Sequence, residues 1–465
     1  MARGTAGGTP MPVQDSLSER SRRAVWHPCT QMKQHEQQPL LSVARAEGAW
    51  LFDSEGRRYL DAISSWWVNL FGHCNPDIRS AIVDQLGRLE HVMLAGCTHA
   101  PVVELSERLA ALTGLGHASY ASDGASAVEI ALKMSAHCWR NRGRPGKSRF
   151  IGLAQGYHGE TVGALSVTDI DIFRTAYGPL VRLSATVPSP DARAAPAGVS
   201  AAEHARHCAA ALEQHLQAHH AETAALVVEP LVQCAAGMAM HDPEYLRLAR
   251  ALCDRFEVHL VADEIAVGFG RTGSMFAHQQ AGIQPDFICL SKGLTGGFMA
   301  LSAVLTTDAV FDAFYDDQVA RGFLHSHSYA GNPLACRAAL ATLDLFERDD
   351  VLARNRATAQ RLSALARPLA QHPRVRHWRQ LGMIWACDVD AGDDPGFAQR
   401  FHAEALARGL LLRPIGNTVY FMPPYVIDDD ACAWLVDGCL GALEATLASA
   451  ARNPAARSVA PLVLA

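Results

Sequence analysis

Residues 260–297 read LVADEIAVGFGRTGSMFAHQQAGIQPDFICLSKGLTGG, and this stretch decides the expected fold. Apolar runs at 258–262 and 287–290, with a third at 225–228, are short, β-branched and bounded by polar or turn residues, which is typical of buried parallel strands. Strand-like and helix-like segments alternate through the middle of the chain. The sequence therefore predicts an α/β fold built on a doubly wound, mostly parallel sheet.

Reactive side chains follow each of these three runs: Glu229, Asp263 and Lys292. Ligand sites in open α/β sheets lie outside the carboxyl ends of the strands, so we expect the three to converge. A lysine at a buried strand end is costly unless chemistry or a partner justifies it. Pyridoxal phosphate is a cofactor that needs such a pair, because it forms a Schiff base with a lysine and its ring nitrogen needs an acidic partner. The plainer alternative is a surface lysine with a helix-capping aspartate.

The composition is that of a globular protein with two or three domains, since 465 residues with 49% hydrophobic side chains can bury a large core. A net charge of -6 without a prominent Lys/Arg cluster argues against nucleic-acid binding. No uninterrupted apolar run approaches the ~18 residues of a membrane span, and the start lacks the apolar segment of a signal peptide. Twelve cysteines without a Cys-x-x-Cys pair suit reduced thiols, so we expect a cytoplasmic protein without disulfides. The closest histidine pairs lack acidic or cysteine companions, and no metal is expected.

The expected organisation has five parts: a disordered start (1–20), an arm and hairpin that join the smaller domain (21–72), a large cofactor-binding domain (73–348), a smaller α/β domain (349–452) and a loose tail (453–465). Within the second part, Trp66 and Trp67 stand side by side ahead of a Gly-His turn at 72–73 and are interpreted as part of a strand. Successive side chains of a strand point to opposite faces, so only one of Trp66 and Trp67 could face the core. A core or dimer contact and a ligand contact are about equally favoured for these tryptophans.

Two further segments indicate cofactor contacts. A strand, a small-residue turn at Gly124 and Ala125 and an Ala-rich helix form the arrangement whose backbone amides hold a phosphate. The alternative is a plain N-cap at Ser122 or Asp123. Tyr157, in a Gly-flanked turn after a strand, could lie flat on a planar cofactor ring.

Together, Asp263-Glu264-Ile265, the GFGRTG segment at 268–273 and the Ser-Lys-Gly at 291–293 resemble the signature of the class III aminotransferases. The resemblance covers the chain from about Trp26 to the last helix. It implies a fold-type I pyridoxal-phosphate enzyme with a large and a small domain, assembled as a homodimer whose active sites are shared.

By this resemblance, Lys292 would carry the Schiff base and shuttle the proton, Asp263 would pair with the ring nitrogen, and Tyr157 and Ile265 would cover the two ring faces. The implied catalytic residues are Lys292, Asp263 and Tyr157. The implied cofactor contacts are Gly124, Ala125, Tyr157, Asp263, Ile265, Lys292, His327 and Ser328, with Ser328 reaching from the partner subunit. Ala125 stands where relatives commonly carry a phosphate-binding serine, which leaves backbone contact or the adjacent Ser126.

Segments 26–32, 64–67, 325–336 and 413–425 are similar to family members of biotin biosynthesis that move the amine of S-adenosylmethionine to 8-amino-7-oxononanoate. The implied substrate contacts are Cys29, Trp66, Trp67, Tyr157, Lys292, Ser326, Arg413 and Tyr420. Arg413 would clamp a carboxylate, because a guanidinium fork suits one bidentately. Cys29 departs from the aromatic residue that relatives often carry. The alternatives are a general ω-aminotransferase using ornithine, 4-aminobutyrate, β-alanine or lysine, and a catalytically idle cofactor-binding protein.

Overall fold

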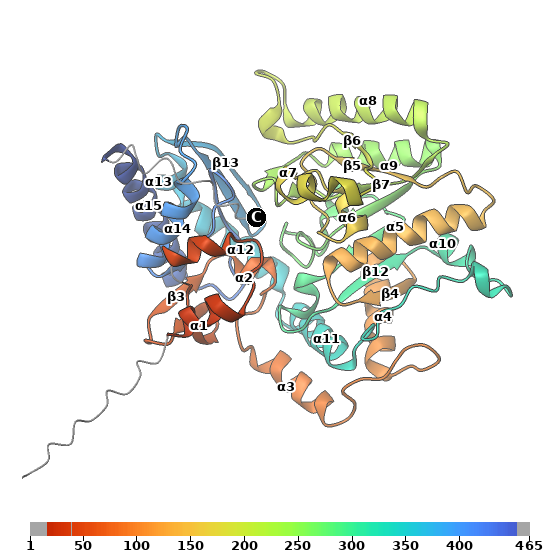
Figure 1. Ribbon diagram of the computed structural model, residues 1–465, viewed down its shortest axis with the longest axis horizontal. Helices are drawn as coiled ribbons and strands as arrows, with labels where there is room; N and C mark the ends of the chain where they lie inside the picture. The colour runs from red at the N-terminus through yellow and green to blue at the C-terminus, as the bar shows by residue number, and fades with distance from the viewer. Residues whose placement is uncertain (1–15, 39, 453–465) are drawn as a thin grey trace, which may run out of the picture.

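The computed structural model describes residues 16–38 and 40–452, which form a larger and a smaller lobe (Figure 1). The larger lobe is built on a seven-stranded sheet with the order β4-β12-β11-β10-β7-β5-β6. Its strands are β4 (His117–Ala121), β5 (Arg149–Leu153), β6 (Ala185–Val187), β7 (Thr223–Val228), β10 (His259–Asp263), β11 (Phe287–Leu290) and β12 (Ser302–Thr306). The three apolar runs of the sequence are β7, β10 and β11, adjacent and buried at every residue.

The sheet is mostly parallel, as predicted. β12 pairs antiparallel with both of its neighbours, whereas the pairs among β11, β10, β7, β5 and β6 are parallel. Successive residues of a strand enter different cores, because their side chains alternate between the two faces. In β7, Ala225 and Val227 belong to one buried cluster and Leu226 and Val228 to the other. Both faces are therefore covered, which is the doubly wound arrangement.

Helices cover these faces. α5 (Gly124–Asn141) packs on β7, β11 and β12, while α11 (Pro333–Arg348) packs against α3 (Pro76–Leu86) and α4 (Ala100–Thr113). The remaining elements of this lobe are α6 (Val162–Val167), α7 (Asp171–Arg174), α8 (Ala201–His219), β8 (Val232–Gln233), β9 (Ala239–Met240), α9 (Glu244–Phe256) and α10 (Asp308–Asp312). Short 3-10 turns complete it: η2 (Thr175–Leu180), η3 (Ala192–Ala194), η4 (Ala277–Ala281), η5 (Lys292–Thr295) and η6 (Val319–Arg321).

The smaller lobe joins the two ends of the described chain. Its C-terminal elements are α12 (Val351–Leu365), α13 (Arg367–Ala370), β13 (Val375–Leu381), β14 (Ile384–Val389), α14 (Phe397–Ala407), β15 (Leu410–Leu411), β16 (Thr418–Phe421) and α15 (Asp429–Arg452). From the N-terminal side come η1 (Met32–Glu36), β1 (Val43–Glu47), β2 (Trp50–Asp53) and β3 (Arg58–Asp61). β13, β14 and β16 form one sheet, and β15 adds to the hairpin as β1-β2-β3-β15. The N-terminal arm is therefore part of this lobe.

Two sequence predictions are wrong in this region. Residues 16–20 are not disordered: α1 (Leu17–Ala24) begins at Ser16, whose side chain and that of Glu19 form a reciprocal capping box. The two tryptophans, interpreted as part of a strand, lie instead in a helical turn, α2 (Ser64–Trp67), of left-handed sense. The predictions for residues 1–15 and for the tail at 453–465 lie outside the described residues.

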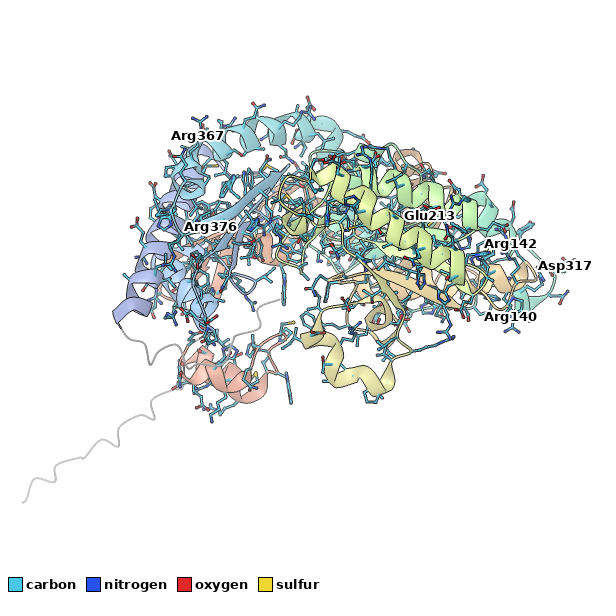
Figure 2. All side chains as sticks on the ribbon, turned by 90° about the horizontal axis from the view of Figure 1, so that it is seen from above. Arg140, Arg142, Glu213, Asp317, Arg367 and Arg376 are labelled. Atoms are coloured by element: carbon cyan, nitrogen blue, oxygen red, sulfur yellow. The ribbon has the colours of Figure 1, made fainter. Side chains whose placement is uncertain are left out.

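In the described part of the chain, one helix is long and apolar enough to cross a membrane by length and composition, and it is Asp429–Ser449 within α15. Four acidic residues interrupt it: Asp429, Asp430, Asp437 and Glu444. α15 packs against α12, α14 and β15, as a core helix of the smaller lobe does. Figure 2 shows charged side chains of both signs spread over the two lobes, among them the labelled Arg140, Arg142, Glu213, Asp317, Arg367 and Arg376.

Candidate active site

A cavity of about 540 Å³ lies at the carboxyl ends of β7, β10 and β11 and is walled by the turn α2. Glu229, Asp263 and Lys292 all line it, so the structure brings together the three side chains that follow the apolar strands. Tyr157, Gly124, Ala125 and Ile265 line it as well, together with Trp66, Trp67 and Cys29.

Lys292 lies two residues after the end of β11 and has a left-handed backbone, with φ of 43°. Its Nζ lies 4.7 Å from the centroid of the Trp67 ring. Burial lowers the pKa of Lys292, although the nearby groups of Cys234, Asp263 and Glu229 act in the opposite direction. A lowered pKa increases the share of neutral amine, which is the nucleophilic form that attacks a carbonyl.

The Asp263 carboxylate is held by two donors. Its Oδ1 accepts from the Ile265 amide at 3.1 Å, and its Oδ2 lies 2.7 Å from Nδ1 of the buried His158. Burial opposes the charged imidazole, but the hydrogen bond and charge of Asp263 prevail and raise the pKa of His158. His158 and Asp263 therefore form a buried, charge-assisted pair beside the ring position that the cofactor would occupy.

Glu229 lies next to this pair. Its carboxylate accepts from the amides of Tyr157 and Cys234, both at 3.0 Å. Burial raises the pKa of Glu229 from its ordinary value of 4.5 to about 7, against the opposing effects of His158 and the two amides. This carboxyl group therefore titrates near neutral pH inside the cavity.

The start of α5, where a phosphate site was predicted, lies at the cavity wall. Asp123 is the N-cap, and its carboxylate accepts from the Ser126 amide and hydroxyl, both at 2.9 Å. The Ser126 hydroxyl is thereby engaged, which leaves the amides of Gly124 and Ala125 as the donors at the cavity wall. Asp123 is thus the N-cap that was considered as an alternative to a phosphate site, and the amides of Gly124 and Ala125 can still donate to a ligand.

Gly159 lets the Tyr157 loop approach this helix start. A Cβ added to Gly159 would lie 2.4 Å from Cβ of Ala125 and 2.8 Å from its Cα, and Gly159 has a φ of 114°. Tyr157 itself donates its hydroxyl to Glu160 Oε1 at 2.9 Å. The close approach of Gly159 to Ala125 therefore determines how far Tyr157 lies from the amides of Gly124 and Ala125.

The turn α2 carries both tryptophans to the cavity. Ser64, Ser65, Trp66 and Trp67 have φ of 51°, 46°, 72° and 72°, and the Val68 amide donates to the Ser64 carbonyl at 3.0 Å, which closes a left-handed helical turn. Left-handed helical backbone costs about 1–2 kcal/mol per L-residue. Consecutive residues of a helical turn are about 100° apart, so Trp66 and Trp67 both reach the cavity wall.

Arg413 and Tyr420 stand behind these indoles. The Arg413 guanidinium carbon lies 5.2 Å from the Trp66 ring centroid, and the Tyr420 hydroxyl accepts from Trp67 Nε1 at 3.2 Å. Arg413 is partly buried and makes no ion pair among the described residues. Burial lowers the pKa of Arg413, because its guanidinium is poorly hydrated and no described acidic side chain forms an ion pair with it. Neither residue lines the cavity itself: Arg413 contacts Trp66, and Tyr420 contacts Trp67.

Cys29 lies at the mouth of the cavity, where its Sγ is 3.9 Å from Glu160 Oε1. Burial and the neighbouring Glu160 raise the pKa of this thiol. Ser326, His327 and Ser328 are on the loop before α11 and do not line the cavity of their own chain. Both serines are exposed there.

These residues fit pyridoxal phosphate. A buried acid with a charged neighbour can face the ring nitrogen, free amides at a helix start can hold the phosphate, and a lysine of lowered pKa can bind the aldehyde carbon. Tyr157 and Ile265 lie in the same cavity and supply flat and aliphatic surfaces for the ring faces.

A family model described as Aminotransferase class-III matches residues 31–443. The chain belongs to the class III aminotransferases. It is 42% identical over 441 residues to an adenosylmethionine-8-amino-7-oxononanoate aminotransferase of Helicobacter pylori, covering 93% of this chain and 99% of the relative. A crystal structure of an enzyme of the same name from Methanocaldococcus jannaschii has a TM-score of 0.85 at 32% identity, over 92% of this chain and 98% of the other. An amine transaminase from an uncultivated Pseudomonas species in the PLP-bound form has a TM-score of 0.86 at 31% identity, over 91% and 99%.

Three residues of this class III aminotransferase that shape the cavity were missed from the sequence. His158 could have been noticed as the neighbour of Tyr157, but nothing local shows that it contacts Asp263. Arg271 lies in the GFGRTG segment without an assigned role, and it is 1% exposed and donates to backbone carbonyls of the α2 region. Asp61 ends a predicted strand, and its contacts with Ser65 and His73 depend on the unforeseen turn.

Proposed function

We propose that this class III aminotransferase moves the amino group of S-adenosylmethionine to 8-amino-7-oxononanoate, yielding 7,8-diaminononanoate for biotin biosynthesis, with pyridoxal phosphate as cofactor. The relatives of that name support the substrate pair, since the similarity extends over nearly the whole of both chains. The cavity supports the cofactor through Lys292, Asp263 and the amides of Gly124 and Ala125.

When bound, pyridoxal phosphate supplies an electron sink that stabilises negative charge on the substrate carbon. Asp263, held in place by the hydrogen bond with His158, would pair with the ring nitrogen and favour its protonated form. Lys292 would bind the cofactor through Nζ, and in its neutral form the same Nζ could accept and return a proton at the reacting carbon. Tyr157 and Ile265 line the cavity and would cover the two faces of the ring, and the buried wall at Trp67 would exclude water.

The single observation that carries the acceptor is Arg413. Lys292 lies over the Trp67 indole and Arg413 over the Trp66 indole, so a substrate that follows the two rings places its reacting carbon near the Lys292 amine and a distant negative group near the Arg413 guanidinium. In 8-amino-7-oxononanoate the ketone and the carboxylate are at opposite ends of a long aliphatic chain. A guanidinium that lacks an acidic partner suits that carboxylate.

The donor is tested by the first half-reaction. Adenosylmethionine alone should convert the bound cofactor from its aldehyde-derived form to its amine form, which is followed by visible absorbance. Conversion only by ornithine, lysine, 4-aminobutyrate or β-alanine would instead assign a general ω-aminotransferase. That second candidate is favoured by one observation, the equally close fold of the amine transaminase. A protein that stays colourless with added pyridoxal phosphate would contradict both.

A homodimer with shared active sites is part of this proposal, as is a cytoplasmic location. The loop that carries Ser326 and Ser328 exposes Leu324 and Tyr329, 74% and 63% accessible, and the Tyr329 ring packs on His91 beside the exposed Met93. A second copy over this apolar surface would bury it and bring the loop to the other cavity. Mixing Lys292→Ala subunits with Ser328→Asp subunits should restore activity that neither variant has alone, if His327 and Ser328 serve the partner's cofactor.

A further inference from the structure

The left-handed turn α2 contains no glycine, although all four of its residues have positive φ. Strained backbone of this kind persists only where the surrounding structure over-determines it. Two buried, oppositely charged side chains, Asp61 and Arg271, contact its two ends. Neither is among the cavity-lining residues.

Asp61 contacts the start of the turn and is fully buried. The Ser65 amide donates to its Oδ1 at 2.8 Å, the Ser65 hydroxyl donates to its Oδ2 at 2.7 Å, and His73 Nε2 lies 3.0 Å from the same Oδ2. The first amides of a helical turn have no partner within it, so a carboxylate satisfies them there. The carboxylate therefore bonds the amide of a residue whose φ is positive.

Arg271 contacts the other end. Its guanidinium donates to the carbonyl of Asn69 at 2.9 Å and of Trp67 at 3.4 Å, and to the carbonyl of Pro423 in the smaller lobe at 2.8 Å. In a right-handed or a left-handed helical turn alike, the carbonyl groups point toward the C-terminal end. An anion at the start of the turn and a cation at its end therefore both stabilise it. The Ser64 hydroxyl adds a hydrogen bond to the Met422 carbonyl at 2.7 Å.

The handedness of the turn decides where the indoles lie. In the extended alternative, Trp66 and Trp67 would point to opposite faces. In the left-handed turn Trp67 lies under Lys292 and bonds Tyr420, while Trp66 lies under Arg413. The turn thus builds one continuous wall from the reacting amine to the unpaired guanidinium.

We propose that Asp61 is a positioning residue whose carboxylate holds Ser64–Trp67 left-handed, so that Trp66 and Trp67 form the wall of the substrate slot. The use of the long-chain keto acid as a kinetic probe rests on the proposed function, whereas the spectroscopic probe below does not. Asp61 acts through the turn and touches neither substrate nor cofactor.

The test combines Asp61→Ala with Ser65→Gly. Glycine adopts positive φ without the steric cost of a Cβ. Ser65→Gly should therefore favour the left-handed backbone at position 65 even when the hydrogen bonds from Asp61 are lost. In the cofactor-free protein, Asp61→Ala should change the near-UV circular dichroism of the indoles, judged against Trp67→Phe as reference. Ser65→Gly in the Asp61→Ala background should restore most of the wild-type signal.

In the loaded enzyme, Asp61→Ala should raise the KM for 8-amino-7-oxononanoate by about tenfold or more, as expected for about 1.4 kcal/mol of lost binding. kcat should fall less, and Ser65→Gly should return the KM toward wild type. The matched control is Asp53→Ala, because Asp53 is also buried and bonds the Glu55 and Arg57 amides in the same sheet. It should alter stability and leave the indole signal and the KM unchanged.

An unchanged indole signal and KM in Asp61→Ala would overturn the proposal, as would a loss that Ser65→Gly fails to restore. If Asp61→Ala does not fold, Asp61→Asn with and without Ser65→Gly provides the same comparison. If the protein uses another keto acid, the wild type will show no turnover with 8-amino-7-oxononanoate. Ser65→Gly should still restore the near-UV signal of the indoles in the Asp61→Ala background. The two measurements therefore distinguish a wrong substrate from a wrong role for Asp61.

Discussion

Gly159→Ala tests the close approach between the Tyr157 loop and the start of α5. The added Cβ would lie 2.4 Å from Cβ of Ala125, where carbon atoms normally keep about 3.5–4.0 Å, so the loop and the helix start must separate by about 1 Å. Overpacking of this kind costs about 1–3 kcal/mol. A φ of 114° adds about 1–2 kcal/mol for any residue with a Cβ.

The control is Gly198→Ala. Gly198 has a φ of 85° and nothing within 4 Å of an added Cβ, so it carries the backbone cost without the clash. The clash alone, about 1–3 kcal/mol, corresponds to a loss of about 5- to 150-fold in pyridoxal-phosphate affinity if the loop yields by moving away from the phosphate amides.

The assay titrates cofactor-free protein with pyridoxal phosphate by visible absorbance and follows urea unfolding of the same samples. We expect Gly159→Ala to lose cofactor affinity and Gly198→Ala to lose only stability. Equal behaviour of the two variants in both measurements would refute the reasoning, because it would mean that the loop and the helix start do not need to touch.

Three further predictions concern charges of the cavity. Arg413→Lys should lower kcat/KM for the keto acid about 10- to 100-fold through KM, as loss of a bidentate clamp does, while the exposed Arg367→Lys should not. Because burial raises the pKa of Glu229 from 4.5 to about 7, its contribution to stability is present below pH 4.5 and is lost as pH rises to 7, at most about 3 kcal/mol. Urea unfolding of cofactor-free protein between pH 4 and 8 should therefore show a slope that Glu229→Gln flattens, and an unchanged slope would contradict this origin. His158→Leu should destabilise the cofactor-free protein by about 2–3 kcal/mol, because a buried carboxylate loses its donor; unfolding equal to wild type would show that Asp263 does not depend on it.

The larger domain was predictable because local pattern decides much of it. β7, β10 and β11 are continuous apolar runs that end in Glu229, Asp263 and Lys292, and strand ends of a parallel sheet meet at one edge. The reversed direction of β12 was not predicted, because its buried, apolar residues carry no signal of strand direction.

The wall of the cavity could not be predicted in the same way. The tryptophan segment follows a strand and was interpreted as extended, but besides Asp61 the left-handed turn contacts groups distant in the sequence: the Met422 carbonyl, the Arg271 guanidinium and the Tyr420 hydroxyl. The His158–Asp263 contact likewise joins residues 105 apart in the chain. Tertiary contacts of this kind override local preference, and no local pattern encodes them.

The α2 turn can form its contacts with the smaller lobe only late in synthesis of the chain, because their partners lie far along the sequence. Ser64 and its acceptor Met422 are 358 residues apart, and Trp67 and Tyr420 are 353 apart. At about 5–20 residues per second, the ribosome needs about 20 to 70 s to travel that distance, whereas the larger domain can begin to fold as its own strands emerge. Trp67 therefore lacks its Tyr420 contact until the segment with Tyr420 and Met422 has left the exit tunnel. Premature termination after Lys292 but before Met422 would leave a domain with Lys292 in place but no wall opposite it.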